Sequence, residues 1–247
     1  MLKDLCRMQD IIFNNIIYSE DKLLTLIKSA GEGAAGLNVT YFNQHCFNIY
    51  YSDNSYKKLL DNNFLVYADG FGIKLALRSL FGRVYKNFNA TDLNEKIMKL
   101  ILNNDKKFVI IGGNFNKADF DKKFSDAVNF VGYYNGYSDV SDFDSLAKNI
   151  HTLVPDVIII GMGVPKQETI AYKLSKEINA SLFLCVGNFL EFYLGTVKRI
   201  PEGFRNTGTE WLFRLFQEPK RLWKRYIIGI PLFIFRVLKI KCIKKNL

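Results

Sequence analysis

The sequence contains few of the residues from which metal sites and catalytic triads are built. Only two histidines, His45 and His151, occur among 247 residues, which leaves little room for a histidine-rich metal site or a Ser-His-Asp triad. The four cysteines are widely scattered and show no metal-ligand spacing, as is typical of proteins in a reducing compartment. We therefore expect no disulfide framework, no bound metal and no resident cofactor.

Long apolar runs are also lacking. No stretch of 18 or more consecutive apolar residues is present, so we expect no transmembrane helix. The N-terminal stretch MLKDLCRMQDIIFNN places acidic residues among its apolar ones and does not have the layout of a signal peptide. No GxGxxG motif follows the first predicted strand, residues 37–43, which disfavours a nicotinamide-dependent dehydrogenase. These absences favour a cytoplasmic protein.

What the sequence does contain is an uneven distribution of charge. The net charge is +10, and residues 198–247 hold 13 of the 34 Lys and Arg residues but only three of the 24 acidic residues. Residues 1–197 therefore hold 21 basic and 21 acidic residues, so the body is neutral and the C-terminal segment is basic. Such a segment favours polyanions: a membrane surface, a phosphorylated substrate or a nucleic acid.

Short apolar runs alternate with amphipathic stretches through most of the chain. The predicted strands cover residues 37–43, 64–67, 106–113, 129–137, 155–163 and 181–189. Short strands separated by helices predict an α/β protein with a Rossmann-like, mostly parallel sheet and helices on both of its faces. We also expect one helical stretch from about residue 44 to about residue 62.

After residue 189 the pattern becomes irregular and then basic and aromatic. The C-terminal stretch reads as helices broken by Pro219 and Pro231. We therefore divide the chain into an α/β catalytic domain, residues 1–195, and a basic helical appendage, residues 196–247, which we expect to associate with a membrane.

One carboxylate lies where a ligand would be expected. The stretch FLVYADGFGI, residues 64–73, reads as strand, turn and helix, with Asp69 and Gly70 at the turn. Ligands of open α/β sheets bind at the carboxyl ends of strands. Asp-Gly pairs are also common in ordinary turns, because the Asp side chain bonds nearby backbone. Taken alone, the pattern favours the turn over a catalytic role.

Two other predicted strands end in glycines. Gly112 and Gly113 close one strand, and Gly161 and Gly163 begin the segment GMGVPKQE. Glycines let a backbone approach a ligand, and a helix N-terminus favours phosphate oxygens, although each motif alone is also a common strand-to-helix turn. Because the carboxyl ends of parallel strands share one edge, these turns and Asp69 together predict a nucleotide or sugar-nucleotide pocket.

The basic segment offers groups that suit phosphate. Its candidates are Lys198, Arg199, Arg214, Arg221 and Arg225. Arginine forks bind phosphate bidentately, whereas a solvated basic helix is the alternative. The interspersed Trp and Tyr residues favour binding to a membrane interface or to a diphosphate. Because residues 227–240 are largely apolar, we consider a membrane the better partner than a nucleic acid. A second subunit would also cover an exposed apolar segment, so a homo-oligomer is a further expectation.

The chain resembles the WecG/TagA/CpsF family of bacterial glycosyltransferases from about residue 20 to about residue 235. The resemblance is carried by ADGFGI, TDL, GYYNGY, PDVIIIGMGVPKQE, VGNFLEFYLGTVKRIP and TEWLFRLFQEPKRLWKRY, in this order. It implies an inverting enzyme that needs no metal. The donor would be a UDP-sugar carrying a hexose or N-acetylhexosamine, such as N-acetylmannosamine, glucose or galactose.

The resemblance also implies an acceptor and a place of work. The acceptor would be a polyprenyl-diphosphate-linked saccharide, used to build a surface polysaccharide such as a teichoic acid, capsule, exopolysaccharide or O-antigen. The enzyme would be peripheral on the inner face of the cytoplasmic membrane, without a nucleic-acid partner. From the residues alone, the competing interpretation is a non-catalytic protein on a Rossmann-like body that binds a membrane surface or nucleic acid.

The matching motifs assign roles to individual residues. Asp69 matches the family's proposed catalytic base, and Thr40 is a second catalytic candidate at the end of the first strand. The implied substrate-binding residues are Asn43, Gly70, Gly112, Gly113, Gly161, Gly163, Gln167, Glu168, Lys198, Arg199, Arg214, Arg221 and Arg225. The basic positions match an appendage that closes over the active site at the membrane.

The chain departs from the family just before TDL. The usual RxxGTDL reads NFNATDL here, with Asn87 and Ala90 in place of Arg and Gly. If that arginine holds the donor or the acceptor, this chain holds it differently and its sugar differs from N-acetylmannosamine.

Overall fold

The structure of the chain is a computed structural model. It describes residues 16–17, 19–29, 36–82, 89–198 and 209–245. Two predicted positions, Arg199 and Asn87, lie outside the described residues.

The described residues form one parallel sheet of six strands in the order β2-β1-β6-β5-β3-β4. The strands are β1 (Leu37–Phe42), β2 (Leu65–Ala68), β3 (Phe108–Gly112), β4 (Phe130–Tyr134), β5 (Val157–Gly161) and β6 (Leu182–Cys185). Every residue of β3, β5 and β6 is buried, as expected for parallel strands covered on both faces. Each predicted strand is confirmed, within a few residues at its ends.

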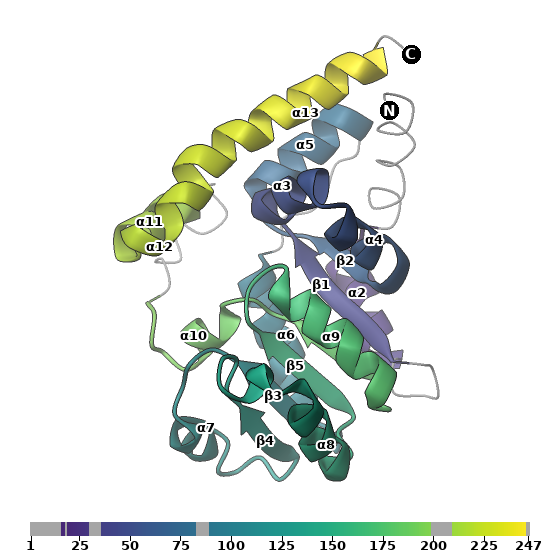
Figure 1. The fold of residues 1–247 in the computed structure, drawn as a ribbon, viewed down its shortest axis with the longest axis vertical. Helices are drawn as coiled ribbons and strands as arrows, with labels where there is room; N and C mark the ends of the chain where they lie inside the picture. The colour runs from purple at the N-terminus through teal and green to yellow at the C-terminus, as the bar shows by residue number, and fades with distance from the viewer. Residues whose placement is uncertain (1–15, 18, 30–35, 83–88, 199–208, 246–247) are drawn as a thin grey trace.

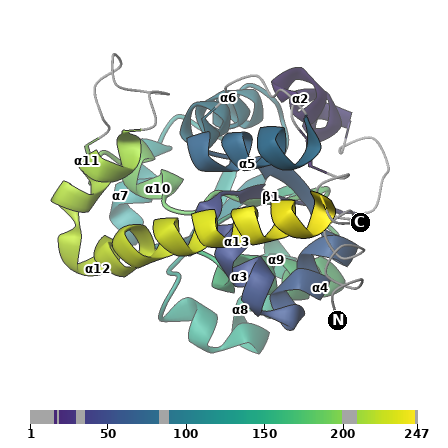
Figure 2. The same ribbon diagram turned by 90° about the horizontal axis from the view of Figure 1, so that it is seen from above.

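Helices cover both faces of the sheet, so the predicted Rossmann-like α/β fold is confirmed. In Figure 2, α2 and α6 lie on one face and α4, α8 and α9 on the other. The helices of the body are α2 (Glu20–Ser29), α3 (Gln44–Ser52), α4 (Asn54–Asn63), α5 (Phe71–Phe81), α6 (Ala90–Leu102), α7 (Lys117–Lys123), α8 (Phe143–Leu153), α9 (Lys166–Glu177) and α10 (Phe189–Tyr193).

The chain reverses its direction across the sheet between β3 and β5. It leaves β3 for β4 on one side and leaves β5 for β6 on the other. Gly112 and Gly161 pair at the carboxyl ends of these two strands. A reversal of this kind opens a crevice between the two connections, and ligands of open α/β sheets bind in such crevices.

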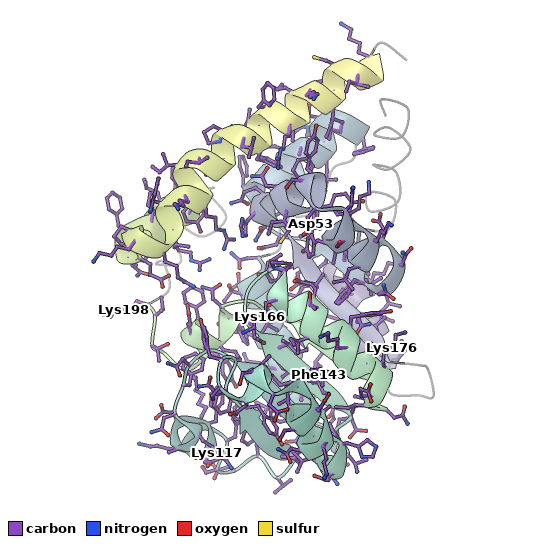
Figure 3. All side chains as sticks on the ribbon, viewed as in Figure 1. Asp53, Lys117, Phe143, Lys166, Lys176 and Lys198 are labelled. Atoms are coloured by element: carbon purple, nitrogen blue, oxygen red, sulfur yellow. The ribbon has the colours of Figure 1, made fainter. Side chains whose placement is uncertain are left out.

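The helical stretch expected from residue 44 to residue 62 is two helices, and a single side chain explains the break. Asp53 has extended backbone angles, and its carboxylate accepts hydrogen bonds from the backbone N–H groups of Ser55 and Tyr56. Asp53 therefore caps α4 instead of continuing α3, as an N-cap aspartate does. The residue is labelled in Figure 3.

The C-terminal segment consists of α11 (Glu210–Gln217), α12 (Pro219–Trp223), a π-helical turn (Lys224–Ile228) and α13 (Gly229–Lys245). The predicted break at Pro219 is present between α11 and α12. The break predicted at Pro231 is wrong, because α13 runs without interruption from Gly229 through Pro231 to Lys245. The π-helical turn immediately before α13 joins it to α12 without a loop.

The helix α13 lies across the body between α5 and α3, as Figures 1 and 2 show. Asn48 of α3 donates from Nδ2 to the carbonyl of Gly229 at 2.7 Å, and Arg236 donates to the Asn48 carbonyl at 2.6 Å. The Phe233 ring meets the Phe47 ring edge-on at 5.0 Å. These contacts dock α13 at a defined position on α3.

Among the helices that the structure describes, none has the length and apolar content needed to span a membrane. The division into residues 1–195 and 196–247 stays a prediction.

We predict that Asn48→Ala loosens α13. The change removes the hydrogen bond from Asn48 Nδ2 to the Gly229 carbonyl, and a hydrogen bond of this kind contributes about 0.5–1.5 kcal/mol. Hydrogen exchange of the backbone amides of α13 should become faster while the amides of β5 stay protected. The matched control is Asn63→Ala, whose side chain bonds only within α4. Unchanged exchange in α13 would contradict the docking role of Asn48.

Candidate active site

A cavity of about 480 Å³ lies between the carboxyl ends of β1, β2 and β6 and the C-terminal helices. It is lined by five of the residues predicted from the sequence: Asn43, Asp69, Gly70, Arg214 and Arg225. These residues are up to 182 positions apart in sequence. Thus the fold gathers a carboxylate, an amide and two guanidinium groups around one space.

Asp69 is held in place by two backbone contacts. Its N–H donates to the Phe42 carbonyl at 2.9 Å, which extends the pairing of β1 and β2 by one residue. Its Oδ1 accepts from the N–H of Ala90 at 3.1 Å, at the start of α6. The other oxygen, Oδ2, makes no hydrogen bond with the described residues and is available to a ligand. Ala90 donates through its backbone, so the glycine usual in the family would supply the same contact.

Two neighbours of Asp69 have conformations that suit a ligand site. Gly70 has a φ of +82°, which residues with a side chain rarely adopt, and no side chain caps the helix α5 that it precedes. Gly70 and Phe71 at this helix start line the cavity, and the first N–H groups of a helix have no partner within the helix. Asn43 caps α3 by accepting from His45 and Cys46 with Oδ1, which leaves its Nδ2 as the donor for the cavity.

The two cavity arginines come from the C-terminal helices. The Nε atoms of Arg214 and Arg225 are buried, and neither has a hydrogen-bond partner within the part of the chain that the structure describes. The Arg214 guanidinium lies 5.5 Å from the centre of the Phe192 ring. Buried unpaired donors are costly, so an anion in the cavity would satisfy both.

The cation of Arg225 also affects a neighbouring histidine. Burial, helped by the Arg225 charge, lowers the pKa of His45 from 6.5 to about 4. His45 is therefore neutral at neutral pH, and the positive charge of this region comes from the arginines and from Lys74, which also lines the cavity.

Thr40, Gln167 and Glu168 do not line the cavity but form a buried network beneath it. All three are 0 % exposed. Glu168 Oε1 accepts from Thr40 Oγ1 at 2.7 Å and from Gln167 Nε2 at 2.8 Å. Gln167 Oε1 accepts from the N–H of Gly187 at 3.0 Å. The network thus ties β1, α9 and the turn after β6 together, so these residues position the strand ends.

Burial raises the pKa of the Glu168 carboxyl from 4.5 to about 7, although the hydrogen bonds from Gln167 and Thr40 act to lower it. Its second oxygen, Oε2, is buried without a hydrogen-bond partner among the described residues. A carboxyl in these surroundings favours its neutral form.

The predicted glycines lie beside the cavity, at the reversal of the sheet. A Cβ atom on Gly112 would lie 2.2 Å from the carbonyl oxygen of Gly161, and one on Gly161 would lie 2.7 Å from that of Gly187. These glycines are therefore required by the close approach of neighbouring strand ends. Gly113 and Gly163 have φ values of +63° and +78°, and no atom lies within 4 Å of the Cβ position of Gly163. Gly163 thus leaves the crevice open.

The remaining basic candidates lie outside the cavity lining. Arg221 binds Glu218 and lies 3.5 Å from Glu191, so its charge is paired. Lys198, labelled in Figure 3, is exposed on the segment that follows α10. Lys166 at the start of α9 donates to the Gly136 carbonyl at 2.9 Å.

Some lining residues were missed by the sequence analysis. Asn188 follows β6 as Asn43 follows β1, so the rule that polar residues gather at strand ends would have found it. Trp211 and Tyr226, whose ring centres are 5.8 Å apart, line the cavity as well. Asn94 lines it and has a buried Nδ2 without a partner in the described chain.

No group of three or more His, Cys, Asp or Glu side chains that could hold a metal ion occurs among the described residues.

A Rossmann-like sheet with a carboxylate and arginines around one cavity at its carboxyl edge defines the class: an α/β protein with a cavity suited to an anionic ligand. Comparison with known proteins makes this specific. The sequence profile of the glycosyl transferase WecG/TagA/CpsF family matches residues 10–247, and the chain belongs to this family.

Curated relatives from three strains of Staphylococcus aureus (MW2, MRSA252 and NCTC 8325 / PS 47) are each 25% identical over 217 residues. The match covers 86% of this chain and 84% of each relative. Each relative is named N-acetylglucosaminyldiphosphoundecaprenol N-acetyl-beta-D-mannosaminyltransferase. The resemblance seen in the motifs is thereby confirmed.

We predict that Glu168→Gln changes how stability depends on pH. Between about pH 4.5 and pH 7 the folded protein keeps a proton on Glu168 that the unfolded chain releases. The Glu168 carboxyl therefore stabilises the fold fully below that range, and this contribution is lost as the pH rises through it. Glutamine does not titrate, so the melting temperature of the variant relative to wild type should rise from pH 5 to pH 7.5.

The control for this measurement is Glu177→Gln, an exposed residue of the same helix. Its melting temperature should follow that of the wild type at both pH values. A Glu168→Gln difference that is equal at both pH values would show that Glu168 keeps an ordinary pKa.

Proposed function

We propose that the protein is an inverting glycosyltransferase that needs no metal. It transfers a hexose or N-acetylhexosamine from a UDP-sugar to a polyprenyl-diphosphate-linked saccharide, on the inner face of the cytoplasmic membrane. The product serves a bacterial surface polysaccharide. The family membership supports the sugar transfer, and the relatives' name, which contains diphosphoundecaprenol, supports the lipid-linked acceptor.

The observation that carries the proposal is one cavity that contains Asp69 beside two arginines whose buried Nε atoms have no hydrogen-bond partner among the described residues. A sugar transfer with inversion needs a base for the acceptor hydroxyl and positive charge for the leaving diphosphate. The carboxylate and the guanidinium groups supply these two kinds of group within one cavity. A nucleic-acid-binding surface would not need the carboxylate.

The crevice between β3 and β5 is the proposed place for the nucleotide. Gly163 opens this edge, and α9 begins beside it at Lys166. Asn188, which follows the neighbouring strand β6, lines the cavity. A donor bound in this way would point its sugar toward Asp69.

The proposed reaction is one displacement. Asp69 Oδ2 accepts the proton of an acceptor hydroxyl while that oxygen bonds to the anomeric carbon. The bond from this carbon to the UDP oxygen breaks, and its electron pair leaves with UDP. Arg214 and Arg225 stabilise the charge on the leaving diphosphate, and hydrogen bonds aimed at developing charge are typically the largest catalytic contribution.

We predict that Asp69→Asn lowers the rate of UDP release by a factor on the order of 10²–10⁴, because it removes the general base. The amide oxygen keeps an acceptor for the N–H of Ala90, so the fold and the binding of UDP should persist. The assay uses a panel of UDP-sugars with a short-chain polyprenyl-diphosphate acceptor. Asp144→Asn, an exposed position on α8, is the control. A rate within a few-fold of wild type would exclude Asp69 as the base.

Membrane binding is proposed for the outer side of α13. Ile228 and Phe235 are more than half exposed and do not line the cavity, and the exposed Lys239 lies near them on the helix. Apolar side chains with nearby lysines fit the interface of an anionic bilayer, where each basic residue contributes about 1 kcal/mol.

We predict that the protein sediments with vesicles containing phosphatidylglycerol and much less with purely zwitterionic vesicles. Phe235→Ser should lower the bound fraction, because it removes an apolar group that enters the interface. Val128→Ser, which changes an exposed valine of the body, should bind like the wild type. Equal sedimentation of wild type and Phe235→Ser would contradict this surface.

A further inference from the structure

Part of the cavity has a lining that the sugar transfer does not use. Away from Asp69, it is walled by apolar side chains of two helices: Phe71 and Leu75 from α5, and Ile230, Phe233, Ile234, Val237 and Leu238 from α13. Four of these, Phe71, Leu75, Ile234 and Leu238, are 50–55% exposed. Single exposed apolar residues are ordinary, but these four gather in one place and face the same space.

The two helices form the sides of a groove. In both views α5 and α13 run side by side (Figures 1 and 2), and they approach closely where a Cβ on Gly72 would lie 3.5 Å from the Phe233 ring. Phe71 and Leu75 are four residues apart, as are Ile234 and Leu238, so each pair lies on one face of its helix. The groove is thus built from matching apolar faces.

The groove is continuous with the charged part of the cavity. From the π-helical turn into α13 the lining changes from Arg225, within the turn, to Ile234 and then Leu238. At 1.5 Å per residue, this path is roughly 20 Å long. Along α5 the lining changes from Gly70, beside Asp69, to Leu75, and it also includes Lys74 and Ser79. A ligand that fills it must be anionic at one end and apolar along the rest.

We propose that the groove between α5 and α13 binds the isoprenoid chain of the acceptor, next to its diphosphate. This rests on the proposed function and adds a binding site for the part of the acceptor that does not react. The polarity of the lining follows the order of groups in such a molecule: sugar at Asp69, diphosphate at the arginines, prenyl chain along the helices. The chain is thereby held by the protein itself, in addition to the membrane.

The groove is distinct from the outer surface of α13. Leu232 is exposed but does not line the cavity, whereas Ile234, two residues later, does. Substitutions at these two positions therefore separate the groove from the general apolar character of the helix. Leu75 gives a third position, on the opposite wall.

The test measures binding of dimethylallyl diphosphate and geranyl diphosphate by titration calorimetry, without vesicles or detergent. The wild type should bind the longer chain at least about tenfold more tightly, because one more isoprene unit is buried. The quantity compared is the affinity for geranyl diphosphate divided by the affinity for dimethylallyl diphosphate. Leu75→Ser and Ile234→Ser should each reduce this affinity ratio to within about threefold while keeping the affinity for dimethylallyl diphosphate. Leu232→Ser should keep the wild-type ratio. Thermal melting checks that each variant folds, and Leu238→Ser replaces a variant that does not.

Three results would overturn the proposal. The first is an affinity ratio near one in the wild type, or an affinity ratio that neither Leu75→Ser nor Ile234→Ser changes. The second is equal competition by monomeric dihexanoyl phosphatidylglycerol, which would make the groove a site for bilayer lipid. The third is a dimer in light scattering that Ile234→Ser dissociates with no change in prenyl affinity, which would make it a subunit interface.

The experiments distinguish an error in the proposed prenyl-binding groove from an error in the proposed sugar transfer. If the protein transfers sugar to prenyl-linked acceptors but the groove variants bind both diphosphates like the wild type, only the groove is wrong. If the ratio and its loss are as expected but no UDP-sugar is consumed with any acceptor, the groove binds prenyl diphosphate and the transfer reaction is wrong.

Discussion

The site depends on one packing contact, the docking of α13 on α3, which Asn48 and the ring pair of Phe47 and Phe233 hold. The Asn48 side chain donates to the Gly229 carbonyl, and the Asn48 backbone carbonyl accepts from Arg236. Because Gly229 directly follows the π-helical turn that carries Arg225, fixing Gly229 also fixes the guanidinium that enters the cavity. Without this contact Asp69 would stand at an open strand end, with solvent in place of the arginines. π-helical turns are frequent at functional sites, and here the turn aims a charged side chain.

A second group of contacts sets the strand ends themselves. Glu168 receives hydrogen bonds from β1 and from its neighbour Gln167, which in turn holds the turn at Gly187. These polar groups are fully buried, so they are costly unless every partner is in place. The network explains how residues outside the cavity can matter for it: they fix the spacing of β1 and β6, after which Asn43 and Asn188 line the cavity.

The sequence predicted the sheet and the place of Asp69 well, because four-residue apolar runs that end in Asp or Gly have few other solutions. The sequence could not distinguish residues that line the cavity from residues of the same type that hold the strand ends together. Glu168 follows Pro165 at a helix start, and the pattern does not say which side of that helix turns toward the sheet. Likewise Gly112 is required by the backbone of Gly161 at 2.2 Å, although a glycine that admits a ligand looks the same in sequence. Pairings made by tertiary contact, such as Asn48 with Gly229, leave no local signal.

Under the proposed function, the C-terminal helices connect the active-site cavity with the membrane surface. One helix presents Arg225 and Ile234 to the cavity and Phe235 to the outside, so its position relative to the body affects both surfaces at once. If, as proposed, a bilayer binds the outer face of α13 better in the docked position, it favours docking, and docking completes the charged cavity. The converse also holds, because binding energies that share one conformational equilibrium are reciprocal. A lipid-linked acceptor that occupies the cavity would therefore strengthen attachment to the membrane from which it came.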